Sequence, residues 1–312
     1  MPRTIDLDAR WALLLAGGDG ERLRPLTRII AGDDRPKQFC RILGQQTLLE
    51  ATERRVARVV PAQRTVVALT RSHERYYRGL LGGRLARSLL IQPANRGTAP
   101  AILYGALRIA AVAPLASVAV FPTDHHVSDD ARFMEHVAMA FAVLGKRPEL
   151  AILLGITPDR AETEYGWIEP SDPIPGTRLL RVGRFVEKPD AALAETLFER
   201  HCLWNSFVLV ACVPTLLALF AQFVPRLMDA FAAVRTALGT ADEERAARTA
   251  YDALESTSFS DAVLAARPAN LATLPVDGIH WSDWGRPRRI LATLEDLGIN
   301  AQWAERAALT MR

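Results

Sequence analysis

The sequence predicts an α/β fold: a doubly wound, mostly parallel sheet with an inserted hairpin and a mainly helical C-terminal part. Short apolar runs alternate with amphipathic stretches through the first half of the chain, and this alternation breaks at a later segment rich in turn residues. Strand–helix alternation is typical of parallel sheets covered by helices on both faces. With 312 residues, 49% of them hydrophobic, the chain can hold one large domain of this kind with an appendage.

Short apolar runs are expected to form the buried strands of this sheet. A strand covered on both faces reads as a continuous apolar run rather than as an alternating one. Such runs occupy residues 11–16, 65–70, 88–92, 117–121 and 150–155, with one more strand expected at 270–276.

Amphipathic stretches between the runs are expected to be helices. One of them reads TLLEATERRVARVV, and its Thr47 is followed three residues later by Glu50, which is the capping-box pattern of a helix start. Two others read TAPAILYGALRIAAV and ARFMEHVAMAFAVLG. The turn-rich segment 158–175 predicts the inserted hairpin, and the chain from Pro214 onward is mostly helical in pattern.

Composition excludes several classes of protein. The formal net charge of +3 argues against a nucleic-acid-binding surface, and the three cysteines form no CxxC pair that would indicate zinc or a disulfide framework. No apolar run approaches the length of a membrane span, and the N-terminal run is too short for a signal peptide. We therefore expect a cytoplasmic protein without nucleic-acid or membrane partners; a homodimer remains an open option.

A glycine-rich stretch, LLLAGGDGERLRPLT, follows the first expected strand. It matches neither the P-loop nor the dinucleotide-binding fingerprint. Glycines at a strand end let backbone N–H groups approach a phosphate or a base edge, and Arg22 adds a fixed charge. Taken alone, the stretch fits an ordinary tight turn equally well.

After the glycine-rich stretch comes an ordered series of further motifs: RPKQF, FPTDHHV, GITPDRAETEYGWIEP, FVEKPD and LWNS, with WSDWG near the end. This series resembles the sugar-nucleotide pyrophosphorylases, and most closely the mannose-1-phosphate guanylyltransferases. The resemblance implies transfer of a nucleotidyl group from GTP to mannose 1-phosphate, or to a related hexose 1-phosphate, giving GDP-mannose and pyrophosphate, with Mg²⁺ as cofactor. It also implies a nucleotidyltransferase catalytic domain over 1–235, with 236–312 completing the active site.

The resemblance assigns charged residues to the reacting groups. By this match Arg22 and Lys37 hold the triphosphate and Lys188 meets the sugar phosphate, so that these three are candidate catalytic residues together with Asp124. Asp124 and Asp283 match the family's two metal-binding aspartates. As isolated residues, the cations would more commonly be solvated surface charges and the aspartates turn or cap residues.

The same resemblance implies two binding surfaces. The sugar would be bound by Tyr165, Gly166, Glu187 and Asn205. The nucleotide would be bound by Leu15, Ala16, Gly17, Gly18, Gly20, Gly97 and Thr98.

The chain departs from the family pattern at several places. Asp19 and Glu21 bring two acids into the glycine-rich stretch, the spacer 28–35 is longer than usual, and Gly97 stands where the guanylyltransferases often have asparagine. Two other functions stay open: a thymidylyl- or uridylyltransferase acting on glucose 1-phosphate, and a non-catalytic sugar-nucleotide-binding regulator. Some relatives carry a β-rich isomerase domain, and we expect no such domain in these 312 residues.

Overall fold

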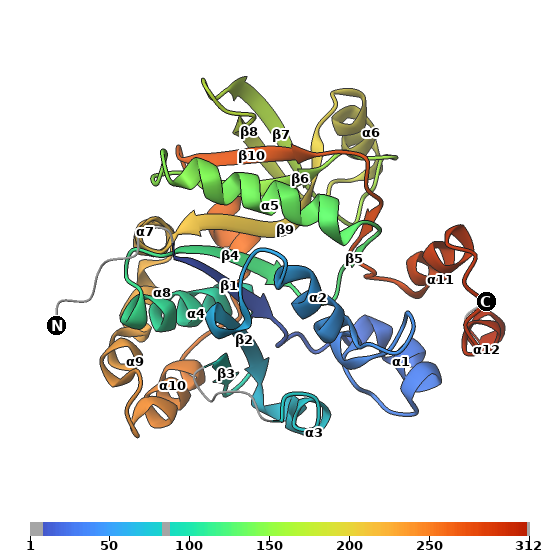
Figure 1. Ribbon diagram of the computed structural model, residues 1–312, viewed down its shortest axis with the longest axis horizontal. Helices are drawn as coiled ribbons and strands as arrows, with labels where there is room; N and C mark the ends of the chain where they lie inside the picture. The colour runs from blue at the N-terminus through green and yellow to red at the C-terminus, as the bar shows by residue number, and fades with distance from the viewer. Residues whose placement is uncertain (1–8, 83–87, 311–312) are drawn as a thin grey trace.

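The computed structural model describes residues 9–82 and 88–310. The first eight residues, part of the stretch considered above for a signal peptide, lie outside the described residues. In the described part, a nine-stranded sheet has the order β3-β2-β1-β4-β9-β6-β10-β8-β7 (Figure 1). The strands are β1 (Arg10–Leu15), β2 (Thr65–Thr70), β3 (Leu89–Gln92), β4 (Ser117–Pro122), β6 (Ala151–Ile156), β7 (Gly166–Pro173), β8 (Leu180–Glu187), β9 (Leu203–Cys212) and β10 (Leu271–Val276).

Helices cover both faces of this sheet, as expected. Those with assigned bounds are α1 (Arg24–Ala31), α2 (Leu48–Val56), α3 (Glu74–Tyr77), α4 (Thr98–Val112), α5 (Asp130–Leu144), α6 (Ala191–Glu199), α7 (Val213–Phe223), α8 (Pro225–Ala230), α9 (Ala232–Ala237), α10 (Glu243–Asp252), α11 (Pro287–Asp296) and α12 (Ala304–Thr310). A short second ladder joins β5 (His126–Val127) to β11 (Trp281–Ser282) in antiparallel fashion.

The sheet is mixed, which corrects the expectation of a mostly parallel one. β1, β2, β3 and β4 run parallel, and β6 is parallel to β10, whereas β9 lies between β4 and β6 and is antiparallel to both. The strand–helix alternation that favours parallel pairing stops after β6, where β7 and β8 follow directly as a hairpin. The hairpin therefore exists but extends over 166–187, further along the chain than the expected 158–175.

The second half of the sheet closes on itself. Besides its pairing with β6, the start of β9 pairs with β7, through Trp167 opposite Trp204. The pairings from β9 through β6, β10, β8 and β7 thus return to β9. Neither β8 nor β9 is among the strands expected from the sequence, although the apolar run of β9 fits a buried strand.

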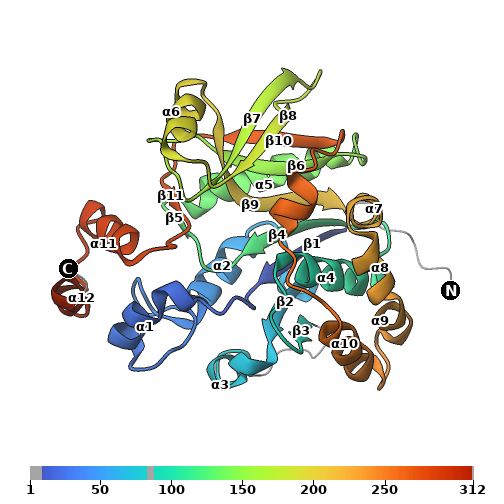
Figure 2. The ribbon, with the colours of Figure 1, turned by 180° about the vertical axis from the view of Figure 1, so that it is seen from behind.

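Side-chain alternation along the central strands builds a core on each face. On β1, Ala12 and Leu14 belong to the cluster under α2, α3 and α5, whereas Leu13 belongs to the cluster under α4 and α7 to α10. Figure 2 shows the sheet from behind, with α4 and the α7–α10 group on that side. The expected start of α2 is confirmed, since the Thr47 side chain accepts a hydrogen bond from the Glu50 N–H and the Glu50 carboxylate accepts one from the Thr47 N–H.

A third apolar cluster lies beyond the ends of the strands. It joins α1 to α11 and α12 through residues such as Leu26, Ile290 and Trp303, with the buried Trp284 ring in it. In Figure 1 these helices stand together at one side of the molecule, away from the sheet. The last part of the chain is thereby held against the segment that follows β1.

Glu243 anchors the helical C-terminal part to α4. Its carboxylate accepts hydrogen bonds from the Tyr104 hydroxyl (2.8 Å), the Arg108 guanidinium (2.6 Å) and the Gly239 N–H (2.8 Å). Burial acts to raise the pKa of Glu243, but these hydrogen bonds and the Arg108 charge outweigh it and hold the pKa below its usual value.

We expect Glu243→Gln to lower the free energy of unfolding at pH 7 by about 2 kcal/mol, because it removes the charge of a buried hydrogen-bond acceptor and the charged partner of the half-buried Arg108. A lowered carboxyl pKa stabilises the fold above the unfolded-state value of about 4.3, and this stabilisation is lost as pH falls through the lower folded-state value. The difference in unfolding free energy between Glu243→Gln and the unaltered protein should therefore become smaller below about pH 4. Urea titrations at several pH values measure this difference. A difference that does not change with pH would contradict a stabilising role of the ionised Glu243 carboxylate.

Candidate active site

The loop after β1 turns its carbonyl groups inward and leaves its N–H groups free. Gln38 donates to the carbonyls of Ala16 (3.0 Å) and Gly18 (2.8 Å), and the Thr70 hydroxyl donates to that of Gly17 (2.9 Å). None of the N–H groups of residues 17–20 donates to another described residue. Free, closely spaced N–H groups form a concavity suited to an anion.

Two glycines of this loop are required by its geometry. A Cβ on Gly17 would lie 2.6 Å from the Gln92 amide nitrogen and 2.8 Å from the Thr70 hydroxyl. Gly20 has φ of +60°, in the left-handed region that disfavours other residues. Glycine at these positions therefore follows from close packing and backbone conformation.

The two unusual acids of the loop are both paired. Asp19 accepts hydrogen bonds from His73 (2.9 Å) and Asn95 (2.7 Å), whereas Glu21 pairs with Arg24 at 3.2 Å on the surface. The spacer 28–35, which is longer than the family pattern, includes the C-terminal turn of α1. Two local ion pairs hold it, one between Arg35 and Asp33 and one between Arg28 and Asp34.

A cleft of about 450 Å³ opens beside this loop. β1 and β4 are parallel neighbours, so the loop after β1 and the residues after β4 meet at one edge of the sheet. The cleft lining contains four of the charged residues expected to act on substrate or metal, namely Arg22, Lys37, Asp124 and Asp283. It also contains Asn95 and His125, to which the sequence analysis gave no role.

Lys37 is the buried cation of the cleft. It stands on a single helical turn, Lys37–Phe39, and only 6% of its surface is exposed. Its ammonium group lies 3.4 Å from the Asp124 carboxylate and donates to the main-chain carbonyls of Trp284 (3.1 Å) and Asp283. Lys37 thus joins the segment after β4 to the WSDWG turn.

The Asp283 carboxylate is fixed through one of its oxygens. Oδ1 accepts from the Gly285 N–H (2.7 Å) and from the Arg289 guanidinium (2.7 Å). Burial acts to raise the pKa of Asp283, but the charges of Lys37, His125 and Arg289 and the Gly285 hydrogen bond outweigh it and lower the pKa. Asp283 is therefore ionised at neutral pH.

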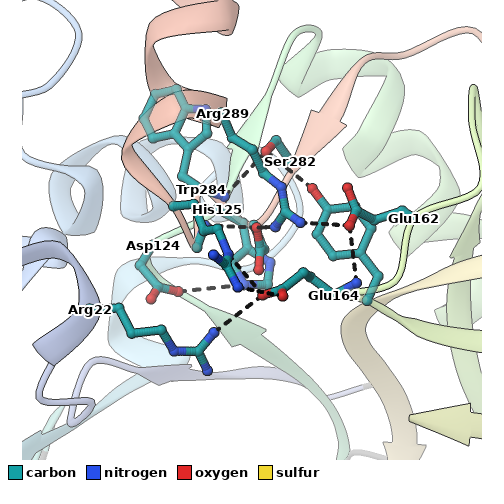
Figure 3. A network of polar contacts seen from close by, with 12 residues as sticks. Arg22, Asp124, His125, Glu162, Glu164, Ser282, Trp284 and Arg289 are labelled. Carbon is teal, nitrogen blue, oxygen red and sulfur yellow. Dashed lines mark hydrogen bonds and ion pairs between the residues drawn. The ribbon is translucent and has the colours of Figure 1, made fainter. Parts of the chain in front are cut away.

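Carboxylates and guanidinium groups form a connected network beside the cleft (Figure 3). Arg289 pairs with Glu162 at 2.8 Å as well as with Asp283, while Glu164 pairs with Arg286 (2.6 Å) and lies 3.6 Å from Arg22. The sequence analysis did not single out four members of this network: Glu162, Glu164, Arg286 and Arg289. A linear pattern does not show which charged residues form pairs when more than a hundred residues separate them in the chain.

The two neighbouring histidines pack against tryptophans. The His126 ring stacks on Trp284 with centroids 4.9 Å apart, and His125 meets Trp281 edge-on at 5.2 Å. Burial lowers the pKa of His126 to about 4, so its ring is neutral near pH 7.

Three of the four residues expected at the sugar lie together on neighbouring strands. Gly166 pairs with Glu187, and a Cβ on Gly166 would lie 2.9 Å from the Glu187 carboxylate and 3.5 Å from the Asn205 Cβ. Lys188 follows with φ of +45° and lies 3.3 Å from Glu187. The Tyr165 ring is instead buried between Trp204 and Trp281, with its hydroxyl 3.3 Å from that of Ser282. These residues are not part of the 450 Å³ cleft lining.

The residues expected at the base already have partners within the protein. The Gly97 N–H donates to the Asn95 side chain (3.0 Å), and a Cβ on Gly97 would lie 2.4 Å from the Thr257 carbonyl oxygen. The Thr98 hydroxyl accepts from the Phe259 N–H at 2.9 Å. Gly97 is thus required by contact with the 257 segment, which sequence reasoning did not anticipate.

A family model described as nucleotidyl transferase matches residues 11–297. The chain belongs to the nucleotidyl transferase family. The match runs from β1 through the WSDWG turn to the residue after α11, so every residue of the cleft lies within it. This nucleotidyl transferase has no helix, within its described residues, that is long and apolar enough to cross a membrane.

Curated relatives of this nucleotidyl transferase are longer proteins. Xanthan biosynthesis protein XanB of Xanthomonas campestris is 32% identical over 92% of the chain, and mannose-1-phosphate guanylyltransferase ManC of Salmonella typhimurium is 31% identical over 88%. The chain spans 60% of the first and 57% of the second.

A solved structure described as a mannose-1-phosphate geranyltransferase of Thermus thermophilus is similar with a TM-score of 0.78. It is 32% identical, and the match covers 91% of this chain and 79% of that one. A putative glucose-1-phosphate thymidylyltransferase of Bacillus anthracis, 16% identical with a TM-score of 0.54 over 95% of this chain and 99% of that one, shares the fold alone.

Proposed function

We propose that this protein transfers a guanylyl group from GTP to mannose 1-phosphate, giving GDP-mannose and pyrophosphate. The observation that carries the proposal is the meeting of Lys37, Asp124 and Asp283 in one cleft, beside a loop with free N–H groups. Condensing two polyanions requires charge neutralisation and alignment, and this cleft offers both. The names of the relatives support GTP and mannose 1-phosphate as the substrates.

The reaction needs little covalent work from the protein. A phosphate oxygen of the sugar phosphate attacks the α-phosphorus of GTP, a new P–O bond forms, and the bond to the β-phosphate oxygen breaks, releasing pyrophosphate. The attacking oxygen is already ionised at neutral pH, so no side chain has to remove a proton. The loop N–H groups, Lys37 and Arg22 hold the triphosphate and stabilise the charge on the departing pyrophosphate.

The donor set of the cleft fits a magnesium ion. Enzymes of this family generally use a divalent metal. Mg²⁺ is commonly bound by one or two carboxylates, with water and substrate phosphates completing its shell. Within the described residues there is no group of three or more His, Cys, Asp or Glu side chains that could form a complete protein cage. Asp124 and the free Oδ2 of Asp283 would hold the ion, which when bound offsets repulsion between the phosphates and polarises the phosphorus.

The proposal also assigns the two parts of the chain. Residues 1–235 form the catalytic domain with the loop, Lys37 and Asp124, and residues 236–312 complete the site by supplying Asp283. Glu187, Asn205 and Lys188 would receive the sugar and its phosphate, since carboxylate and amide oxygens suit sugar hydroxyls and the ammonium suits phosphate. Tyr165 would support that pocket through its backbone and the buried ring behind it.

A pyrophosphate-release screen tests this function directly. The purified chain is offered four nucleoside triphosphates in combination with several hexose 1-phosphates and Mg²⁺, and we expect the highest turnover with GTP and mannose 1-phosphate. An Asp124→Asn preparation made in the same way controls for contaminating enzymes. Faster turnover with dTTP or UTP and glucose 1-phosphate would reassign the base and sugar, and GDP-mannose binding without any turnover would favour the regulator.

A further inference from the structure

Arg289 lies at the junction between the Asp283 turn and the segment that precedes β7. From α11 its guanidinium reaches the Asp283 carboxylate at 2.7 Å and the Glu162 carboxylate at 2.8 Å (Figure 3). The same group lies 4.5 Å from the centroid of the Tyr165 ring. Only 12% of the Arg289 side chain is exposed, so water screens these contacts weakly.

This contact decides which oxygen of Asp283 remains available. Oδ1 is occupied by Arg289 and by the Gly285 N–H, whereas Oδ2 has no hydrogen bond to any described residue. A guanidinium holds its donors in a rigid planar fork, so it fixes the rotation of the carboxylate more tightly than an ammonium would. Asp283 is thereby held with one oxygen available to a ligand in the cleft.

The same guanidinium supports the start of β7. Its contacts with Glu162 and the Tyr165 ring lie directly before Gly166, the residue that pairs with Glu187. The Glu162 carbonyl also accepts from the Trp167 indole N–H at 2.8 Å, so this short segment is held on both sides. One side chain therefore connects the Asp283 turn to the strand pair that carries Glu187.

We infer that Arg289 is a positioning residue, which holds Asp283 in its metal-binding orientation and couples it to the sugar side of the site. The inference rests on the proposed function for the identity of metal and sugar. Outer partners that orient metal ligands typically contribute about ten- to a hundredfold in metal affinity or activity.

The test compares Arg289→Gln and Arg289→Lys with Arg288→Gln. Arg288 is the adjacent arginine of α11, and it is exposed with no contact recorded to a described residue. Mn²⁺ binding is measured by its electron paramagnetic resonance signal without turnover, and kcat and KM are measured separately with Mg²⁺. We expect Arg289→Gln to weaken Mn²⁺ binding about tenfold. We expect it to lower kcat by at least as much, with partial recovery in Arg289→Lys and no change in Arg288→Gln.

A sugar-side variant separates the two halves of the role. Glu162→Gln keeps the contact between Arg289 and Asp283 but weakens the one that supports the start of β7. We expect it to raise the KM for the sugar phosphate several-fold while Mn²⁺ affinity stays within twofold of the unaltered protein. If Glu162→Gln changes the KM for the sugar phosphate and the Mn²⁺ affinity by the same factor, the contact with Glu162 does not act on the sugar side alone, and this part of the inference is wrong.

The outcomes also separate this inference from the proposed function. Unchanged Mn²⁺ affinity in folded Arg289→Gln, or an equal loss in Arg288→Gln, overturns the positioning role even if turnover is found. If the unaltered chain releases no pyrophosphate with any substrate pair, the proposed function fails, while the Mn²⁺ comparison still decides whether Arg289 positions Asp283. Thermal unfolding of each variant confirms that folded protein is compared.

Discussion

Replacing Asp124 or Asp283 by asparagine should lower turnover about a hundredfold or more, the usual loss when one strong electrostatic contact is removed from a transition state. Asparagine keeps the shape of the side chain and removes its charge. Because both carboxylates would act through one metal ion, their losses should not add. The double variant should be only slightly slower than the slower single variant.

The effects on stability should differ between the two sites. Asp124 is about one third exposed, and its ion pairs with described residues are those with Lys37 and, at 3.6 Å, with His125. Asp283 shares the buried Arg289, so Asp283→Asn leaves that guanidinium with Glu162 as its remaining charged partner. We expect a loss of no more than about 1 kcal/mol for Asp124→Asn, because Lys37 keeps its two carbonyl acceptors. For Asp283→Asn we expect a loss of about 1–3 kcal/mol, the range for a hydrogen bond to a charged group.

Turnover measured against Mg²⁺ concentration for the three variants, with thermal unfolding alongside, decides the matter. Additive losses would mean that the two carboxylates act independently. If Asp283→Asn keeps the turnover and metal dependence of the unaltered protein, the WSDWG turn is structural. The metal would then depend on Asp124 with another partner.

The sequence predicted correctly the position of site residues that directly follow a buried strand. The loop after β1 and Asp124 after β4 follow continuous apolar runs, and parallel pairing brings the two together at one edge of the sheet. β9 shows the limit of such reasoning: its apolar pattern fits a buried strand, but nothing local tells that it enters between β4 and β6 in the antiparallel sense.

Long-range charge pairing was beyond reach for a different reason. Arg289 is one of three arginines in the stretch GRPRRIL, and its partner Glu162 lies 127 residues earlier in a segment with other acids. Propensity and periodicity describe neighbours in the chain, whereas this contact depends on α11 lying beside the segment that precedes β7. Gly97 illustrates the converse, because its motif suggested base binding and its contact with Thr257 gives it a structural reason.

Replacing Lys37 by methionine should damage both catalysis and folding. Methionine has similar length and fits a buried site but carries no charge and no donor. Removing a cation that stabilises the departing pyrophosphate should lower turnover about a hundredfold to a thousandfold. It would also leave the carbonyls of Asp283 and Trp284 without their donor, at a cost of about 1–3 kcal/mol in the free energy of unfolding.

The loss of stability expected for Lys37→Met follows from the backbone of the WSDWG turn. Trp284 has φ of +47°, a left-handed conformation that is unfavourable for an aromatic residue. Under the proposed function Lys37 has two roles: its charge meets the triphosphate, and its hydrogen bonds hold the turn that contains Asp283.

Arg22→Met provides the matched comparison. Arg22 belongs to the same cleft, but its side chain is 66% exposed and its recorded contact is a 3.6 Å ion pair with Glu164. We expect Arg22→Met to lower turnover while leaving the unfolding temperature within about a degree, and Lys37→Met to lower both, at temperatures where each variant remains folded. An unchanged unfolding temperature in Lys37→Met would show that the turn holds its conformation without the lysine. Unchanged turnover would remove Lys37 from the triphosphate site, and the free N–H groups of the loop and Arg22 would then have to hold the triphosphate without it.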